Sequence, residues 1–215
     1  MREFHYAAIR EQKWDSEILG LIAAIYKEAG KQEMYLKQRP EELEKLVEIA
    51  KIQSTEASNK IEGIVTTNTR IKQLCEEKTT PRNRDEEEIS GYRDVLNTIH
   101  ESYEYIPLTA NYILQLHGML YHYSGRGIGG RFKNVQNYIS ETHADGTTFV
   151  RFTPLEPYET PDAVAAICES YNKAIDDGII DPLLLIPIFI NDFLCIHPFN
   201  DGNGRMSRLL TLLLL

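Results

Sequence analysis

The chain has 215 residues, of which 42% are apolar, and its 32 acidic against 23 basic side chains give a formal net charge of −9. A chain of this length can form one large domain or two small ones around a real hydrophobic core. The acidic balance argues against a nucleic-acid backbone as the main partner, because that binding needs a basic face. The three cysteines lack a CxxC spacing, which excludes a disulfide framework and a zinc finger.

Neither the start of the chain nor its most apolar segment has the pattern of an export signal or a membrane span. The start, MREFHYAAIREQKWDSE, carries charges throughout and lacks the apolar core of a secretory signal. The most apolar segment, PLLLIPIFINDFLCI at 182–196, is too short and interrupted for a bilayer span and predicts a buried central helix. We therefore expect a soluble cytoplasmic protein with no membrane partner. The last residues, RLLTLLLL, stop inside an uncapped apolar run, so we also expect the natural chain to continue.

Helical spacing of apolar residues dominates the first third of the chain. A first helix is predicted to begin with Ser16 as its cap and to end at Gly30. A second is predicted from Pro40, a residue favoured at the first helical position, to the stop at Gly63. After a turn near Asn68, a short segment follows before the most polar run of the chain.

That polar run, EEKTTPRNRDEEE at 76–88, predicts a solvated loop that leads into a helix capped by Asp85. Three more helices are predicted from their start signals: Thr109, Thr160 with Pro161, and Asp181 with Pro182. Gly178 ends the second of these three. Pro187 falls inside the third, where it should produce a kink.

Only one stretch departs from the helical period. Residues 138–154, YISETHADGTTFVRFTP, have β-favouring side chains on both sides of Asp145-Gly146, a dipeptide that suits a two-residue hairpin turn. Because no second strand-rich region exists, the hairpin is an appendage of a helical body. The predicted fold class is all-α with one β-hairpin.

The segment GRGIGG at 125–130 satisfies the G-x-G-x-x-G pattern of dinucleotide-binding sites. That pattern works after a strand and before a helix in a βαβ unit, and here it follows a helix with no parallel strand nearby. It is not a phosphate-binding P-loop either, because Arg131 follows Gly130 where Lys is required. A flexible loop is the better interpretation.

The segment HPFNDGNGRMSR at 197–208 carries the residue types that a polyphosphate site needs. Small residues in the turn allow backbone N–H groups to converge, and the next helix adds its positive N-terminal end, which together favour an anion. Arg205 and Arg208 can donate to phosphate oxygens, and Asp201 is a hard oxygen ligand for Mg²⁺. His197 can accept a proton near neutral pH. Taken singly, each of these residues is more often a turn, cap or surface residue.

The same segment resembles the Fic motif, HxF, an acidic residue, then GNGRxxR, at every signature position. LTANYILQLHGML and GGRFKNVQNYIS upstream are similar to the helix and flap approach of that family, so the resemblance covers about residues 55–215. It implies a compact Fic-type helical core with a β-hairpin flap, in agreement with the pattern above. We place the core at 64–215 and the preceding helices at 1–63. The GRGIGG segment then becomes the loop before the flap.

The resemblance implies transfer of AMP from ATP to a hydroxyl group of a target protein. His197 would be the general base and Asp201 would hold Mg²⁺. The nucleotide would be bound by Gly202, Asn203, Gly204, Arg205 and Arg208. The flap would add a strand to the target's backbone, with Ile139, Thr148, Phe149 and Val150 as its target-binding residues. The target is unknown; self-modification and a homodimer are compatible with the resemblance.

A second motif, SNKIEG at 58–63, is similar to the family's inhibitory pattern of Ser or Thr, three residues, Glu, then Gly or Asn. Alone it would read as an ordinary helix end capped by Gly63. Beside the Fic motif it implies a built-in inhibitory helix of Ser58, Glu62 and Gly63, in which Glu62 pairs with Arg208 and displaces the γ-phosphate. Two alternatives stay open: a hydrolase that removes AMP with the help of Glu62, and a non-catalytic nucleotide-binding module.

Overall fold

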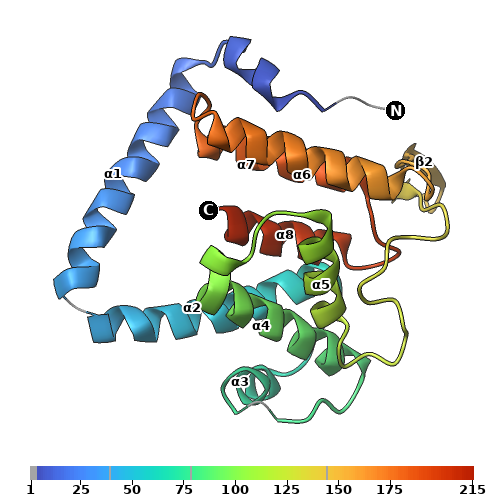
Figure 1. Ribbon diagram of the computed structural model, residues 1–215. Helices are drawn as coiled ribbons and strands as arrows, with labels where there is room; N and C mark the ends of the chain where they lie inside the picture. The colour runs from blue at the N-terminus through green and yellow to red at the C-terminus, as the bar shows by residue number, and fades with distance from the viewer. Residues whose placement is uncertain (1–3, 39, 78, 144) are drawn as a thin grey trace.

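The computed structural model describes residues 4–38, 40–77, 79–143 and 145–215. Its elements confirm the predicted class, a helical body with one antiparallel hairpin (Figure 1). In chain order the elements are η1 (Tyr6–Glu11), α1 (Ser16–Gln38), α2 (Pro40–Ile61), α3 (Asn68–Glu76), α4 (Arg84–Ser102), η2 (Tyr103–Tyr105), α5 (Ala110–Leu120), β1 (Ile139–Thr142), β2 (Thr148–Phe152), α6 (Thr160–Asp176), α7 (Pro182–Ile196) and α8 (Asn203–Leu214).

The hydrophobic core lies among α4, α5, α6, α7 and α8. The apolar helix α7 is central to it, as predicted: Leu185, Phe189, Phe193 and Ile196 are buried in one continuous cluster. Asp181 caps this helix by accepting a hydrogen bond from the Leu183 amide at 2.8 Å. Within the described ranges, no helix is long and apolar enough to cross a membrane.

The first two helices form an arm that bends around one side of this core (Figure 1). The predicted end of the first helix at Gly30 is wrong, because α1 continues to Gln38. One interior glycine costs a helix only about 1 kcal/mol, and the good helix formers around it supply enough support. The predicted cap is also wrong by one position: Asp15 accepts the hydrogen bond from the Ile18 amide, and Ser16 is already helical.

The second helix, α2, ends close to the predicted stop, with Gly63 in the left-handed region at φ 76°. Its apolar spacing does not face the core, since Leu46 and Val47 are exposed. The buried side chains of α2 are polar: Thr55, Ser58 and Asn59. The part of α2 that packs on the core is therefore the end that carries the SNKIEG motif.

The sequence predicted that the polar run at 76–88 is solvated, and this prediction is wrong in part, because two of its carboxylates are buried. Asn83, and not Asp85, caps α4 by accepting from the Glu86 amide at 3.0 Å. Glu86 is buried because Arg70 of α3 pairs with it at 2.6 Å, and this hydrogen-bonded cation lowers the pKa of Glu86 to about 2. Glu88 is buried as well. Glu86 and Glu88 are buried in this polar run because each has a cationic partner from another part of the chain.

The hairpin pairs β1 with β2 in antiparallel register, with Thr142 opposite Thr148. The predicted two-residue turn is too short, since five residues separate the ends of the two strands. The Gly146 backbone nevertheless has the positive φ, 84°, for which glycine was expected there.

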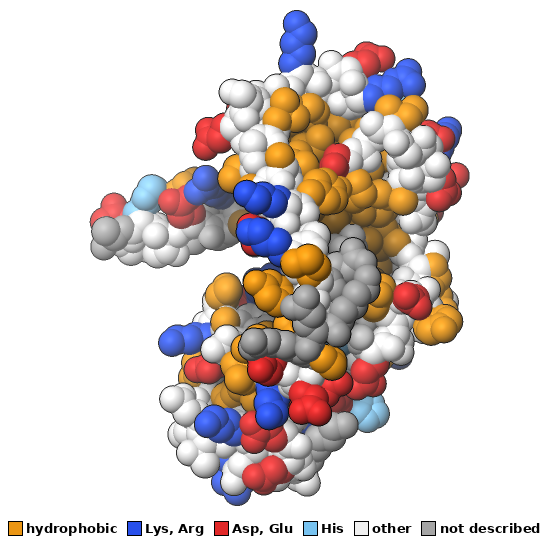
Figure 2. All heavy atoms as spheres, turned by 90° about the vertical axis from the view of Figure 1, so that its left-hand side faces the viewer, with side chains coloured by type: hydrophobic (Ala, Val, Ile, Leu, Met, Phe, Trp, Pro, Cys, Tyr) orange, Lys and Arg blue, Asp and Glu red, His pale blue; other side chains and the backbone are white. Residues whose placement is uncertain are grey.

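Hydrophobic side chains gather on the side of the molecule where α1 lies (Figure 2). A groove of about 320 Å³ between α1 and α7 is lined by Trp14, Ile18, Ile22, Leu184, Pro187 and Ile188. No residue of the HPFNDGNGRMSR segment lines this groove, so it does not belong to the site described next.

Candidate active site

The HPFNDGNGRMSR segment connects α7 to α8. His197 follows the last residue of α7 and adopts the left-handed conformation, with φ 51° and ψ 63°. Its amide still donates to the Phe193 carbonyl at 2.9 Å, so His197 caps α7 and turns the chain away from the helix axis. The half-buried imidazole thus lies where the central helix of the core gives way to the motif turn.

The turn places backbone N–H groups at the start of α8. Gly202 is the N-cap of this helix at φ 84°, a conformation that favours glycine. The Asn203 side chain is fully committed to holding the turn: its Nδ2 donates to the Phe199 carbonyl at 2.8 Å and its Oδ1 accepts from the Phe199 amide at 2.9 Å. What this helix end offers an anion is therefore backbone N–H groups.

Arg208 of α8 reaches α2. Its Nε donates to the Ser58 hydroxyl at 2.7 Å, and its Nη2 donates to the Ser58 carbonyl at 3.0 Å and to Glu62 Oε1 at 2.7 Å. A Cβ added at Gly204 would overlap Glu62 Oε1. The Glu62 carboxylate therefore lies both on the Arg208 guanidinium and against the N-terminal turn of α8, where a phosphate group would be expected.

Arg205 does not project beside Arg208, contrary to the expectation that both side chains face a phosphate. It is 1% exposed, its Nη2 lies 2.8 Å from Glu88 Oε2, and it donates to the Tyr121 hydroxyl at 2.7 Å. The guanidinium also lies 5.4 Å from the centre of the Tyr121 ring. Residues three apart share one face of a helix, but here the two side chains diverge: Arg205 meets Glu88 of α4, and Arg208 meets α2.

Asp201 is flanked by two guanidinium groups. Its Oδ2 accepts from Arg126 at 2.8 Å, its Oδ1 accepts from the Gly202 amide at 2.7 Å, and Arg205 Nη2 lies 3.8 Å from Oδ1. Burial favours the neutral form of this carboxyl, but the cations and the amide outweigh it and hold the pKa of Asp201 below its usual value. Asp201 is therefore an ionised, partly exposed carboxylate that could serve as an oxygen ligand.

These residues fit Mg²⁺ as a metal held by one carboxylate. No group of three or more His, Cys, Asp or Glu side chains in the described part of the chain could form a closed protein cage. Mg²⁺ is commonly bound by one or two carboxylates together with substrate phosphates, and it keeps several waters. Asp201 beside the anion-binding turn has that character.

His117 of α5 packs against the motif turn and forms hydrogen bonds to both the turn and the GRGIGG loop. It stacks on Phe199 with ring centroids 3.7 Å apart, its Nε2 lies 3.1 Å from the Asp201 carbonyl, and its Nδ1 accepts from the Gly130 amide at 3.1 Å. Burial lowers its pKa to about 4, which keeps the ring neutral and able to accept at Nδ1. The LHGML helix and the GRGIGG loop are thereby tied to the motif.

Charged neighbours also act on His197. Burial is the main cause that lowers its pKa, and the positive charge of Lys133 lowers it further, while the Leu194 carbonyl and the Glu62 carboxylate oppose the shift. A lowered pKa keeps the imidazole in the neutral form that can accept a proton. Glu62 therefore acts electrostatically on both His197 and Arg208.

The hairpin residues singled out from the sequence lie on the strands: Ile139 on β1, and Thr148, Phe149 and Val150 on β2. Phe149 and Val150 are 43% and 53% exposed, so two apolar side chains face solvent. The segment before β1 is joined to the motif by two bonds, from Asn137 Nδ2 to the Phe199 carbonyl and from Asn200 Nδ2 to Asn134 Oδ1, each 3.0 Å long.

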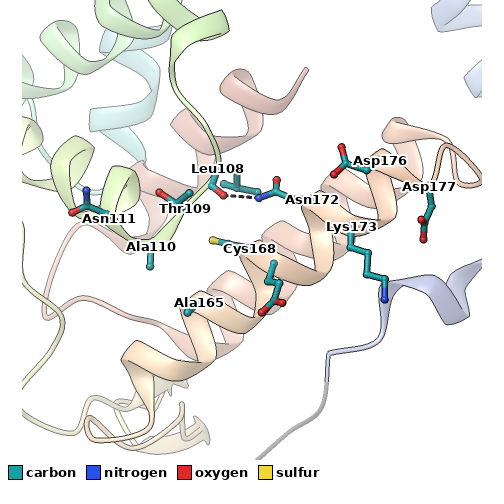
Figure 3. Close-up of a pocket in the computed structure, with 11 residues that line it drawn as sticks. Leu108, Thr109, Ala110, Asn111, Ala165, Cys168, Asn172, Lys173, Asp176 and Asp177 are labelled. Atoms are coloured by element: carbon teal, nitrogen blue, oxygen red, sulfur yellow. Dashed lines mark hydrogen bonds between the residues drawn. The ribbon is translucent and has the colours of Figure 1, made fainter.

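A pocket of about 770 Å³ lies apart from this site, between the start of α5 and α6 (Figure 3). Cys168 and Asn172 of α6 line it, and Asn172 Nδ2 donates to the Leu108 carbonyl at 2.9 Å across it. Burial raises the pKa of the Cys168 thiol to about 12, which makes it unreactive near neutral pH. No motif residue lines this pocket.

Residues of the site that were not singled out from the sequence include Glu88, Tyr121, Arg126 and Lys133. Each acts on the motif from 63 or more positions away along the chain. Arg126 lies inside the GRGIGG loop and Lys133 inside GGRFKNVQNYIS, two segments that the sequence indicated. The roles of Glu88 and Tyr121 become visible only when the fold brings α4 and α5 against α8.

A sequence profile of the Fic/DOC family matches residues 107–215, half of the chain, including the whole HPFNDGNGRMSR segment. The chain belongs to the Fic/DOC family.

Solved structures agree with this assignment. A Fic domain-containing signaling protein from Bacteroides thetaiotaomicron VPI-5482 is 30% identical, with a TM-score of 0.71 over 82% of this chain and 66% of that one. A Fic family protein from Desulfovibrio desulfuricans G20 shares the fold at 20% identity and a TM-score of 0.72, over 94% of this chain and 58% of that one.

Among curated proteins, the ribonucleoside-diphosphate reductase small chain of Ostreid herpesvirus 1 (isolate France) is 31% identical over 94 residues. That similarity covers 35% of this chain and 16% of the viral protein. The chain thus spans less than two thirds of each of these three relatives.

Proposed function

We propose that this Fic protein is a self-restrained adenylyltransferase that transfers AMP from ATP to a hydroxyl group of a target protein. The observation that carries the proposal is the position of the Glu62 carboxylate, on Arg208 at 2.7 Å and against Gly204 at the start of α8. A site that holds a carboxylate by a guanidinium and a helix N-terminus is chemically suited to a terminal phosphate. Glu62 and the γ-phosphate would then exclude each other.

In this proposal the chain's own residues bind, orient and accept a proton. Backbone N–H groups of the Gly202–Gly204 turn bind phosphate oxygens, and Arg208 binds the γ-phosphate once Glu62 has left it. Asp201 would hold Mg²⁺, which would supply positive charge to the phosphates of the nucleotide. His197, kept neutral by its surroundings, accepts the proton of the target hydroxyl as that oxygen attacks the α-phosphorus.

Three bonds describe the balance of the reaction. The target O–H bond breaks as its proton passes to His197, a new bond forms between the target oxygen and the α-phosphorus, and the bond to the bridging oxygen breaks to release pyrophosphate. The exposed strand β2, with Phe149 and Val150, would hold the target as an added strand beside the site.

The test uses ATP labelled at the α-phosphate, Mg²⁺, a cell lysate as the source of targets, and three proteins: the natural sequence, Glu62→Gly, and Glu62→Gly with His197→Ala. We expect label on protein with Glu62→Gly, little with the natural sequence, and none with the double variant. Label delivered from the γ-phosphate instead would refute AMP transfer. Mass spectrometry of the labelled proteins, including this chain itself, would identify the added mass and the modified residue.

A further inference from the structure

The backbone of His197 is held in an unfavourable conformation. Among the described residues, it is the one non-glycine residue with a positive φ. The left-handed region costs a residue with a side chain about 1–2 kcal/mol, and such a residue persists only where its surroundings over-determine it. The contacts around His197 must therefore stabilise a backbone conformation that this residue would not favour by itself.

Lys133 contacts the backbone on both sides of His197. Its Nζ donates to the Ile196 carbonyl at 3.0 Å, and its backbone N–H donates to the Pro198 carbonyl at 2.8 Å. Rotation of His197 toward a helical or extended conformation would change the relative positions of these two carbonyls. A single residue that binds both of them thus opposes that rotation.

The lysine is itself fixed in place. It is 3% exposed, and Nζ also donates to Asn137 Oδ1 at 3.1 Å, while Asn137 Nδ2 donates to the Phe199 carbonyl. Burial lowers the pKa of Lys133 to about 8, with Glu156 opposing the shift. Within the described part of the chain, its close partners are carbonyl and amide oxygens, with no carboxylate at ion-pair distance. Burying an ammonium on such partners is costly, and stability alone is a poor reason for it.

We propose that Lys133 is a positioning residue for the catalytic base: it holds the Ile196–Pro198 backbone in the conformation that presents the His197 imidazole to the reaction. Lys133 acts only through this backbone and contacts neither nucleotide nor target. Asn137 extends the same support to Phe199. The approach to the flap therefore has a role in catalysis that is separate from target binding. This inference rests on the proposed function for its kinetic consequence, and on geometry for its structural one.

The test compares three substitutions in the Glu62→Gly background. Lys133→Met removes the side-chain bonds and keeps the backbone bond, whereas Lys133→Arg keeps a buried cation that can donate. Arg93→Met is the matched control, since Arg93 is also buried and also donates to a carbonyl, that of Leu74 on α3, away from the motif. A general loss of stability should appear at least as strongly in the control, because Arg93 also pairs with Asp94 at 2.6 Å.

For AMP transfer, Lys133→Met should lower kcat about 100-fold with KM for ATP changed less than about threefold, because a misplacement of about 1 Å costs that much. Lys133→Arg should recover most of the loss, and Arg93→Met should leave both constants unchanged below its melting temperature. A Lys133→Met protein that keeps its kcat within about twofold would overturn the proposal.

Nuclear magnetic resonance of ¹⁵N-labelled histidine gives a readout that needs no activity. The His197 ring signals should move in Lys133→Met and stay in place in Arg93→Met; unmoved signals in Lys133→Met would also overturn the proposal. If Lys133→Met fails to fold, Asn137→Ala serves instead, and again the His197 signals must move. Should the Glu62→Gly parent transfer no AMP, the proposed function fails, while the ring signals still decide the role of Lys133.

Discussion

Glu62→Gly is the substitution whose effect can be worked out best from the structure. It removes the carboxylate from Arg208 and from the N-terminal turn of α8. The two side chains of the pair are 31% and 36% exposed, so solvent screens their attraction, and such pairs contribute up to about 1 kcal/mol. An anion at a helix N-terminus contributes a further 0.3–1 kcal/mol or so.

Together these contributions predict that the restraint amounts to about 0.5–2 kcal/mol. Since about 1.4 kcal/mol corresponds to a factor of ten, the initial rate of AMP transfer at low ATP should rise about 2- to 30-fold. By linkage, ATP should bind to the variant more tightly by the same factor, which calorimetry can measure. Raising the salt concentration should weaken the restraint in the natural sequence, because the pair is partly exposed.

Two variants isolate the cause. Glu62→Gln keeps the shape of the side chain and removes its charge, so it should give most of the increase. Lys60→Gly introduces the same flexible residue near the end of α2 at an exposed position and should give none. A Glu62→Gly rate within about twofold of the natural sequence, or an equal increase in Lys60→Gly, would refute the reasoning.

Three further predictions concern the supports of the site. Arg126→Gln should lower the Mg²⁺ concentration needed for half-maximal AMP transfer, because Arg126 no longer pairs with Asp201 Oδ2; Arg151→Gln on the hairpin should leave it unchanged. His117 has a pKa of about 4 in the fold against 6.5 when unfolded, so the stability from its neutral form is complete above pH 6.5 and is lost as pH falls toward 4. Between pH 7.5 and 5.0 the free energy of unfolding, measured with urea, should fall by about 2 kcal/mol more in the natural sequence than in His117→Gln. Glu88→Gln should cost about 3–5 kcal/mol of stability by thermal or urea unfolding, because it leaves the buried Arg205 charge uncompensated, and a cost no greater than that of Glu87→Gln would contradict this.

The sequence predicted best what lies close together along the chain. The caps Thr109 and Asp181, the central helix α7 and the hairpin around Gly146 are each determined by a few neighbouring residues. Much of the candidate site is local in the same sense, because the HPFNDGNGRMSR segment holds the proposed base, the proposed metal ligand and the proposed anion-binding turn within twelve consecutive positions.

Partners from distant positions could not be predicted. The polar run at 76–88 has the composition of a loop, and nothing in it indicates that Glu88 meets Arg205 or that Glu86 meets Arg70. Lys133 looks like any surface lysine until α7 is placed against it. Burial of a charge depends on what the fold brings to it, and a pattern of charges along the chain does not contain that information.

Burial also separates the ion pairs of this site into two kinds. Arg205 and Glu88 are 1% and 2% exposed, so removing either partner leaves a buried charge unpaired by its main counter-ion. This pair should therefore persist when nucleotide binds. The pairs of Arg208 with Glu62 and of Arg126 with Asp201 are each about a third exposed, so solvent, Mg²⁺ and phosphate can replace their partners at little cost. We therefore expect Arg205 to act on the nucleotide by holding the turn, through Asp201 and Tyr121, and Arg208 to meet the phosphate directly. The net charge of −9 does not prevent a polyphosphate ligand from binding. The cations that would bind the ligand are present in the site, and they are paired with carboxylates of this chain that the ligand can replace.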